Sequence, residues 1–140
     1  MTTLIVNIDV DDLARAKAFY LAAFELRVGR TFGAAAIGVE LVGAGTLIYL
    51  LTKASGTTPA AGAGAATRDY RRHWTPVHLD FIVDDIAAAV ARVVTAGATR
   101  ESEIEDHKYG KFAQFADPFG HGFCLIELVG RGYDEIADPR

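Results

Sequence analysis

The stretch VDDLARAKA (Val10–Ala18) returns in the second half of the chain as VDDIAAAVA (Val83–Ala91). In both copies a largely apolar segment, LIVNIDV or VHLDFIV, leads into a pair of aspartates. Short apolar segments of this kind predict strands. Aspartates that follow such a strand are typical of a helix N-terminus, which their side-chain oxygens cap. The repetition therefore predicts two copies of one strand–helix unit.

Both predicted helices have one apolar face, as expected for helices that pack on a sheet. The apolar positions are Leu13, Ala16, Tyr20, Ala23 and Phe24 in the first helix, and Ile86, Ala89, Val90, Val93 and Ala96 in the second. Gly97 is the expected end of the second helix, because glycine readily adopts the left-handed conformation found there.

Three short β-like segments follow each predicted helix. They are LRVGRTF, AAIGVELV and TLIYLLT in the first half, and TRESEIE, KFAQFA and GFCLIEL in the second. Turns at Gly43–Gly45, Lys108–Gly110 and Pro118–Gly120 separate several of them. The sequence thus predicts βαβββ units over residues 3–52 and 76–129. They are joined by a flexible Gly- and Ala-rich crossover over residues 53–75 and followed by a tail over residues 130–140.

Composition limits the classes of function. The chain has 140 residues, enough for one domain, and a formal net charge of −4, which argues against nucleic acid or an anionic membrane as a partner. The single cysteine, Cys124, fits a reducing compartment. The first residues, MTTLIVNIDVDD, lack the basic region of a signal peptide, and no apolar run approaches the length of a membrane helix. We therefore expect a soluble, cytoplasmic protein.

The doubled βαβββ pattern, the VDDL motif, the long crossover and the DPFG turn (Asp117–Gly120) together resemble the vicinal-oxygen-chelate superfamily. That group includes glyoxalase I, extradiol dioxygenases, fosfomycin-resistance transferases and bleomycin-resistance proteins. The resemblance runs from Leu4 to about Leu128. It implies a single α+β domain over residues 1–140, in which each mixed sheet curls into a half-barrel with its helix on the convex side. The concave side would hold the ligand or metal, but such a scaffold hosts many chemistries.

Strand alternation then sorts the side chains of the first strand of each unit. Val77, Leu79, Phe81 and Val83 should lie under the second helix, which leaves His78, Asp80 and Ile82 on the concave side. In the first unit the concave set is Ile5, Asn7 and Asp9. The resemblance implies metal ligands near the start of the first strand and within the last strand of each unit. Matched onto this chain, those positions hold Ile5, Tyr49, His78 and Cys124.

This set of residues is poor in metal donors. Isoleucine cannot bind a metal and tyrosine is an uncommon ligand, while His78 and Cys124 alone fall short of the three protein ligands typical of catalytic zinc. Asp80 could complete that number. We therefore expect no cofactor, with a divalent metal at His78 and Asp80 as the alternative. Cys124 is expected to be a small buried hydrophobe, and Glu127 to face the opposite way.

Other polar or aromatic residues leave two interpretations open. DYRRHW (Asp69–Trp74) fits a pocket rim or a subunit contact. EDHKYGKF (Glu105–Phe112) fits a substrate-side loop, with His107 and Tyr109 closing over a ligand, or an ordinary polar hairpin. His121 is expected to be solvated in its turn. His78 could be a ligand-lining residue or a metal-binding or acid–base residue.

The leading hypothesis is a metal-independent binding protein of the bleomycin-resistance kind, which holds a small, partly aromatic molecule. The expected ligand-binding residues are Asn7, Tyr49, Trp74, His78, Asp80, His107, Tyr109 and Cys124. One alternative is a metal-dependent lyase, isomerase or dioxygenase that uses His78 and Asp80. Another is a metal-free enzyme with His78 or His107 as catalytic base. Open sheet edges predict a homodimer, with Tyr133 and Ile136 of the tail as anchors.

Overall fold

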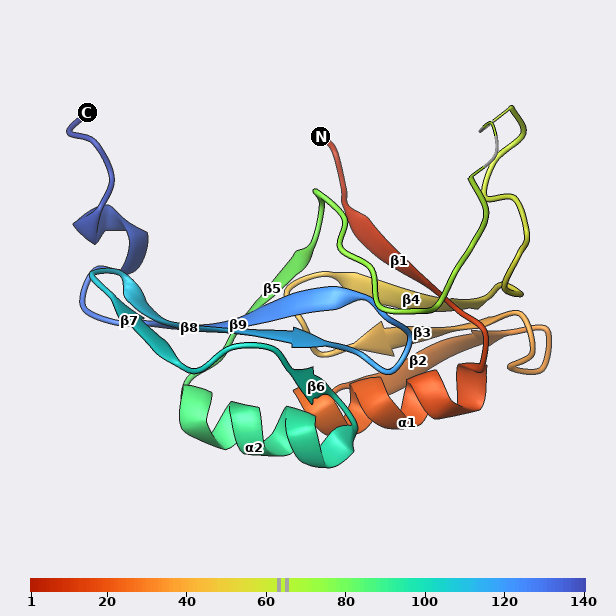
Figure 1. Ribbon diagram of the computed structural model, residues 1–140, viewed down its shortest axis with the longest axis horizontal. Helices are drawn as coiled ribbons and strands as arrows, with labels where there is room; N and C mark the ends of the chain where they lie inside the picture. Colours follow the sequence, from red (N-terminus) through yellow and green to blue (C-terminus); the bar gives the residue numbers. More distant parts are fainter. Residues whose placement is uncertain (63, 65) are drawn as a thin grey trace. The chain divides into compact units, whose positions relative to one another are not determined.

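A computed structural model describes residues 1–62, 64 and 66–140. The chain divides into two compact units, Met1–Arg71 and Arg72–Arg140, which are described separately below. Each unit contains one strand, one helix and a further set of strands in the predicted order (Figure 1). The predicted α+β class with two mixed sheets is confirmed, and neither sheet closes into a barrel.

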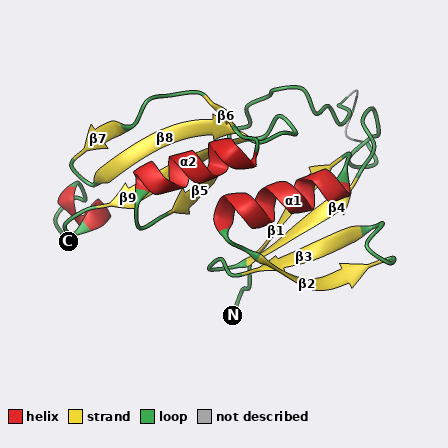
Figure 2. Ribbon diagram, turned by 90° about the horizontal axis from the view of Figure 1, so that it is seen from below, coloured by secondary structure: helices red, strands yellow, loops and turns green. Residues whose placement is uncertain are grey.

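The first unit consists of β1 (Ile5–Val10), α1 (Leu13–Phe24), β2 (Arg27–Phe32), β3 (Gly38–Val42) and β4 (Leu47–Thr52). The sheet order is β1-β4-β3-β2, with β1 parallel to β4 and the other pairs antiparallel. Asp12 caps α1, since its side chain accepts a hydrogen bond from the Arg15 amide at 3.0 Å. The helix lies across one face of this sheet (Figure 2). It buries Ala16, Phe19, Tyr20 and Ala23.

The second unit consists of β5 (Leu79–Ile82), α2 (Ile86–Ala96), β6 (Thr99–Arg100), β7 (Glu105–His107), β8 (Gly110–Ala116), β9 (Gly122–Leu128) and a final 3₁₀ turn, η1 (Gly132–Glu135). The sheet order is β5-β9-β8-β6, β7 also pairs with β8, and β5 runs parallel to β9. Asp85 caps α2, and Gly97 ends it with a φ of 123°. Both helix boundaries agree with the sequence prediction.

The segment TRESEIE (Thr99–Glu105) differs from the prediction, because it is not one strand: its first two residues form β6, and its last residue, Glu105, begins β7. Between β6 and β7 the Ser102 hydroxyl accepts a hydrogen bond from the Gln114 amide at 2.8 Å. A side chain thus takes the place of a backbone carbonyl in the ladder, so the chain leaves the sheet at this point.

Alternation along the strands is largely as predicted. Phe115, Phe123 and Leu125 are buried on the α2 side, and Leu79 is paired with Phe123 in the same row. Val77 does not follow the prediction: β5 begins only at Leu79, so Val77 precedes the strand and is 84% exposed.

Two side chains of the crossover form hydrogen bonds within the first unit. The Arg68 Nε donates to the Asp9 carboxylate at 2.7 Å, and the Tyr70 hydroxyl donates to the Lys53 carbonyl at 2.6 Å. These bonds give parts of the predicted crossover defined contacts, and its flexibility over residues 53–75 stays a prediction. Positions 63 and 65 of that segment lie outside the described residues.

The two α-helices have 12 and 11 residues. Within the described part of the chain, no helix is both long and apolar enough to cross a membrane.

Candidate ligand-binding and metal site

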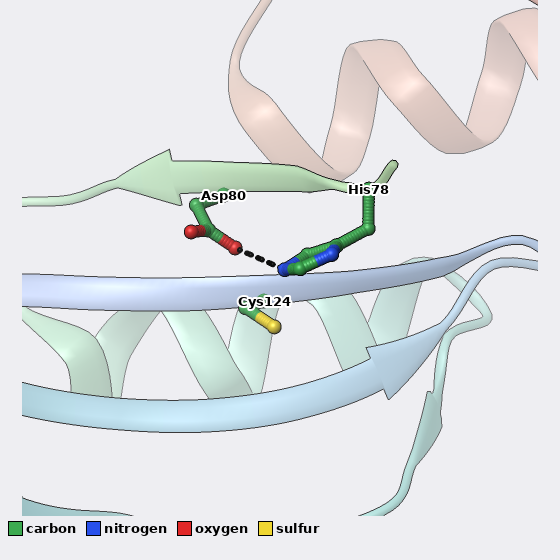
Figure 3. Close-up of side chains that lie close together, drawn as sticks. All are labelled: His78, Asp80 and Cys124. Carbon is green, nitrogen blue, oxygen red and sulfur yellow. Dashed lines mark ion pairs between the residues drawn. The ribbon is translucent and has the colours of Figure 1, made fainter. Parts of the chain in front are cut away.

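Three predicted site residues, His78, Asp80 and Cys124, lie together on the face of the second sheet opposite α2; we call them the His78 cluster. His78 immediately precedes β5, Asp80 lies within it, and Cys124 of β9 is the direct neighbour of Asp80 in the register. The His78 Nε2 is 3.2 Å from the Asp80 Oδ1 (Figure 3). One donor atom from each of the three residues lies within 4.8 Å of the others.

The period of the strands explains this arrangement. Phe123 and Leu125 point toward the core, so Cys124 between them points to the opposite face. Glu127 points away from the His78 cluster, as predicted, and its carboxylate accepts a hydrogen bond from the Ile86 amide at 2.8 Å. It therefore binds the first turn of α2, where a negative charge is stabilising.

Cys124 is held as a neutral thiol. Its side chain is buried, and burial is the main cause that raises the pKa of the thiol to about 12. The negative charge of Asp80 and a hydrogen bond to it raise the pKa further, against a smaller opposing effect of Gln114. The thiolate is the nucleophilic form of cysteine, so this geometry argues against a nucleophilic role.

Trp74 lies beside the cluster. Its ring centroid is 4.7 Å from that of His78, and the Arg72 guanidinium carbon is 5.6 Å from the Trp74 ring centroid. Arg72 is itself held by two hydrogen bonds of 2.6 Å to Glu101. Gly122 leaves room for the indole, since a Cβ at that position would lie 2.3 Å from the Trp74 Cε3. Trp74 of DYRRHW thus lies next to His78, and the two interpretations of that segment, a pocket rim or a subunit contact, both stay predictions.

The other predicted aromatic pair forms a stack with the C-terminal tail. The His107 and Tyr109 rings are parallel within 3° at a centroid distance of 5.1 Å, and Tyr109 lies 5.1 Å from Tyr133. Burial, then the charge of Asp80, raises the pKa of Tyr133. Tyr133, predicted as an anchor on a partner subunit, is thus packed against its own unit.

The DPFG turn is held by hydrogen bonds of its own aspartate. The Asp117 side chain accepts hydrogen bonds from the backbone amides of Phe119 and His121, at 2.8 and 2.9 Å. The expectation that His121 is solvated is wrong, because it is partly buried and its Nδ1 lies 3.0 Å from the His73 Nε2. Residues of the crossover end, too far away in sequence for a local pattern to reveal, provide that contact.

In the first unit Asn7 and Tyr49 are direct neighbours in the register of β1 and β4. The Tyr49 hydroxyl donates to the Glu40 carboxylate at 2.6 Å and accepts from the Arg30 guanidinium at 2.6 Å. Glu40 is 6% exposed, and its pKa is lowered to about 2, chiefly by the hydrogen bond from Arg30 and then by that from Tyr49. Sequence reasoning missed Arg30 and Glu40. The one sequence feature that could have pointed to this pair is Glu40, a single carboxylate inside the apolar segment AAIGVELV.

The His78 cluster has the donors of a three-ligand metal site. Bonds from zinc to protein donors are about 2.0–2.3 Å, so tetrahedral neighbours lie about 3.5 Å apart. With all donors within 4.8 Å, no pair would need to close by more than about 1.3 Å. One imidazole, one carboxylate and one sulfur suit Zn²⁺ better than a hard ion. Binding would require Cys124 to lose its proton and His78 to separate from Asp80.

Comparisons with known proteins agree with this fold. Residues 5–126 match the family described as Glyoxalase-like domain. The uncharacterized protein Mb0911c of Mycobacterium bovis is 32% identical over 137 residues, which cover 91% of this chain and 84% of that protein. The anthracycline biosynthesis protein DnrV of Streptomyces peucetius is 32% identical over 134 residues, covering 94% of this chain and 43% of DnrV, so this chain spans less than half of that relative.

Two solved structures share the fold at low sequence identity. A variant of the fosfomycin resistance protein FosX of Listeria monocytogenes, in complex with Mn(II) and 1S,2S-dihydroxypropylphosphonic acid, has a TM-score of 0.65 at 18% identity, covering 90% of this chain and 88% of FosX. TnmS3, an antibiotic binding protein of Streptomyces sp. CB03234, has a TM-score of 0.63 at 21% identity, covering 91% and 96%. These solved structures show a shared fold, which is also that of a glyoxalase/bleomycin resistance/dioxygenase family enzyme from Burkholderia phytofirmans PsJN. The family match over residues 5–126 establishes that the chain belongs to the Glyoxalase-like domain family.

Proposed function

We propose that this chain binds a small, partly aromatic molecule at the His78 cluster and that binding requires no metal ion. The observation that carries the proposal is the Trp74 ring, which lies 4.7 Å from His78 and is seated over Gly122. An indole offers a large, rigid face for stacking, and the 46% exposure of Trp74 leaves part of that face available. His78 and Asp80 would add polar contacts that orient the ligand.

Metal independence is supported by the state of the candidate donors. Of the four positions that the superfamily resemblance assigns to metal ligands, Ile5 has no donor. The Tyr49 hydroxyl is engaged by Glu40 and Arg30. In the second unit, His78 and Asp80 contact each other, and Cys124 keeps its proton at neutral pH because its pKa is raised to about 12. A ligand can bind next to these groups without changing any of them.

Relatives support the class of ligand. TnmS3 is described as an antibiotic binding protein and DnrV as an anthracycline biosynthesis protein. We carry over from them the expectation of a planar aromatic natural product.

The test uses Trp74, which is the single tryptophan of the chain. An anthracycline is titrated into the protein in the presence of EDTA, and quenching of tryptophan emission is followed. We expect saturable quenching with one ligand per chain. By calorimetry, Trp74→Ala should weaken binding by about tenfold, the size of a lost aromatic contact. Asp80→Asn should weaken it, while Asp84→Asn, outside the cluster, serves as the matched control. Binding that appears only when metal is added would overturn the proposal.

A metal-dependent lyase, isomerase or dioxygenase is the second candidate, and the three donors within 4.8 Å favour it. A bound Zn²⁺ would act as a Lewis acid on a substrate oxygen. His78, Asp80 and Cys124 would hold it. Metal analysis of protein purified without chelator distinguishes the two candidates. One equivalent of tightly bound divalent metal that is lost in His78→Ala would favour the enzyme and refute metal-independent binding.

A further inference from the structure

An arginine of β2, Arg30, is fixed on the first sheet by hydrogen bonds to Glu40 and Tyr49. We propose that the Arg30 guanidinium is an anion-binding point that receives the carboxylate or phosphonate group of a small molecule through its Nη1. This inference is independent of the proposed function, because it concerns other residues in the other unit.

The hydrogen bonds of Arg30 leave one side of the guanidinium available. The Glu40 Oε2 accepts from Nε at 2.9 Å and from Nη2 at 2.5 Å, and Tyr49 accepts from Nη2 at 2.6 Å. Among the described residues, Nη1 has no hydrogen-bond partner. The Arg30 side chain is 66% exposed, whereas that of Glu40 is 7% exposed. The buried carboxylate therefore holds the guanidinium from one side, and its two Nη1 hydrogens remain for a ligand.

The backbone is shaped to make this arrangement. The register of β2 and β3 shifts between Val28 and Thr31, which marks a β-bulge. A bulge reorients the side chains of its strand, and bulges are frequent next to binding sites. The Arg30 amide donates to the Glu40 Oε1 at 3.2 Å, so Glu40 also binds the bulge itself. Gly29 makes room for that contact, because a Cβ there would lie 2.5 Å from the Glu40 Oε1.

Immobilisation is what separates Arg30 from an ordinary surface arginine. A long side chain loses rotamer entropy when a ligand fixes it, and a side chain that is already fixed avoids this cost. Guanidinium groups bind oxyanions through short, directional hydrogen bonds, which an ammonium group cannot reproduce with the same geometry. Arg71 is the contrasting case in the same unit. It also pairs with a carboxylate, that of Asp69, but the two side chains are 89% and 44% exposed.

The experiment is an NMR titration of the full chain with methylphosphonate and, separately, with acetate, with ionic strength balanced by chloride. We expect saturable shifts at the Gly29 and Arg30 amides and at the Arg30 Nε–H. Arg30→Lys keeps the positive charge but loses the planar donor group, so it should weaken binding of the preferred anion by at least about tenfold. Arg71→Lys is the matched control and should bind as the parent chain does. Saturation with methylphosphonate would identify the preferred anion as a phosphonate, and saturation with acetate would identify it as a carboxylate.

Three outcomes would overturn the proposal: no saturable shift with either anion, equal affinity in Arg30→Lys, or an equal loss in Arg71→Lys. If Arg30→Lys fails to fold, the same titration of Tyr49→Phe tests the proposal instead. That variant removes one anchor of Nη2 and should lower affinity severalfold, whereas unchanged affinity contradicts the proposal. This titration does not use Trp74 fluorescence as a readout. A failure of the anion-binding proposal can therefore be told apart from a failure of the proposed function.

Discussion

Gly122→Ala tests whether the Trp74 ring can pack on β9 only because position 122 has no side chain. An added Cβ would lie 2.3 Å and 2.4 Å from the Cε3 and Cζ3 atoms of Trp74, and 3.1 Å from the Arg72 Nη2. Ordinary van der Waals contact begins near 3.4 Å, so the ring must retreat by about 1 Å. The backbone itself offers no obstacle, because Gly122 does not have a positive φ.

The expected cost follows from the contacts that the ring would lose. The pairing of Trp74 with His78 is of a type worth about 0.5–1.5 kcal/mol. The stacking of Arg72 on Trp74 is of a type worth about 0.5–1 kcal/mol at an exposed site. Since both would weaken together, we expect Gly122→Ala to lower the free energy of unfolding by about 1–2 kcal/mol. A chain of this size would then melt about 3–6 °C lower.

The free energy of unfolding is measured by urea unfolding, followed by circular dichroism, for four proteins: the parent chain, Gly122→Ala, Trp74→Ala and the double variant. In the Trp74→Ala background the Arg72 Nη2, 3.1 Å away at the end of a flexible side chain, is the one remaining close contact given for the added Cβ. The alanine should then be neutral or stabilising by up to about 1 kcal/mol, because it reduces the entropy of the unfolded chain. Gly45→Ala is the control, since a Cβ there meets nothing within 4 Å. An equal cost of Gly122→Ala in both backgrounds would refute the reasoning, because the clash would then not be with Trp74.

Glu40 has a folded-state pKa of about 2 against an ordinary value of 4.5, so its stabilising contribution is present above about pH 4.5 and is lost as the pH falls toward 2. Glu40→Gln should therefore be less stable than the parent chain at pH 7 and should lose less stability between pH 5 and 2; parallel pH profiles by thermal melting would contradict this. Cys124, with a pKa raised to about 12, should not react with a thiol reagent at pH 8 until urea unfolds the chain, and rapid reaction of the folded protein would show that it is accessible. Sedimentation at micromolar concentration should give a homodimer, weakened by deletion of Gly130–Arg140; a single species near 15 kDa would rule the dimer out.

Much of the fold, and the shared face of Asp80 and Cys124 in the candidate site, follow from local sequence patterns. The aspartates before Leu13 and Ile86 cap helices because a cap depends on the next three residues only. Strand alternation places Asp80 and Cys124 on one face because the period of a strand is two. The parallel pairing of the first and last strands then brings them side by side. The same rule was wrong for Val77, since alternation does not tell where a strand begins.

Only the tertiary structure decided the contacts between residues with no shared local pattern. The pairing of Arg30 with Glu40 depends on a bulge, which breaks the alternation on which the sequence argument relied. The position of Trp74 depends on the missing side chain of Gly122, and that of His121 on His73 from the end of an aperiodic crossover. A hydrophobic period reports which face of an element is buried. It contains no information on which distant side chain fills the space beside it, because packing across elements settles that choice.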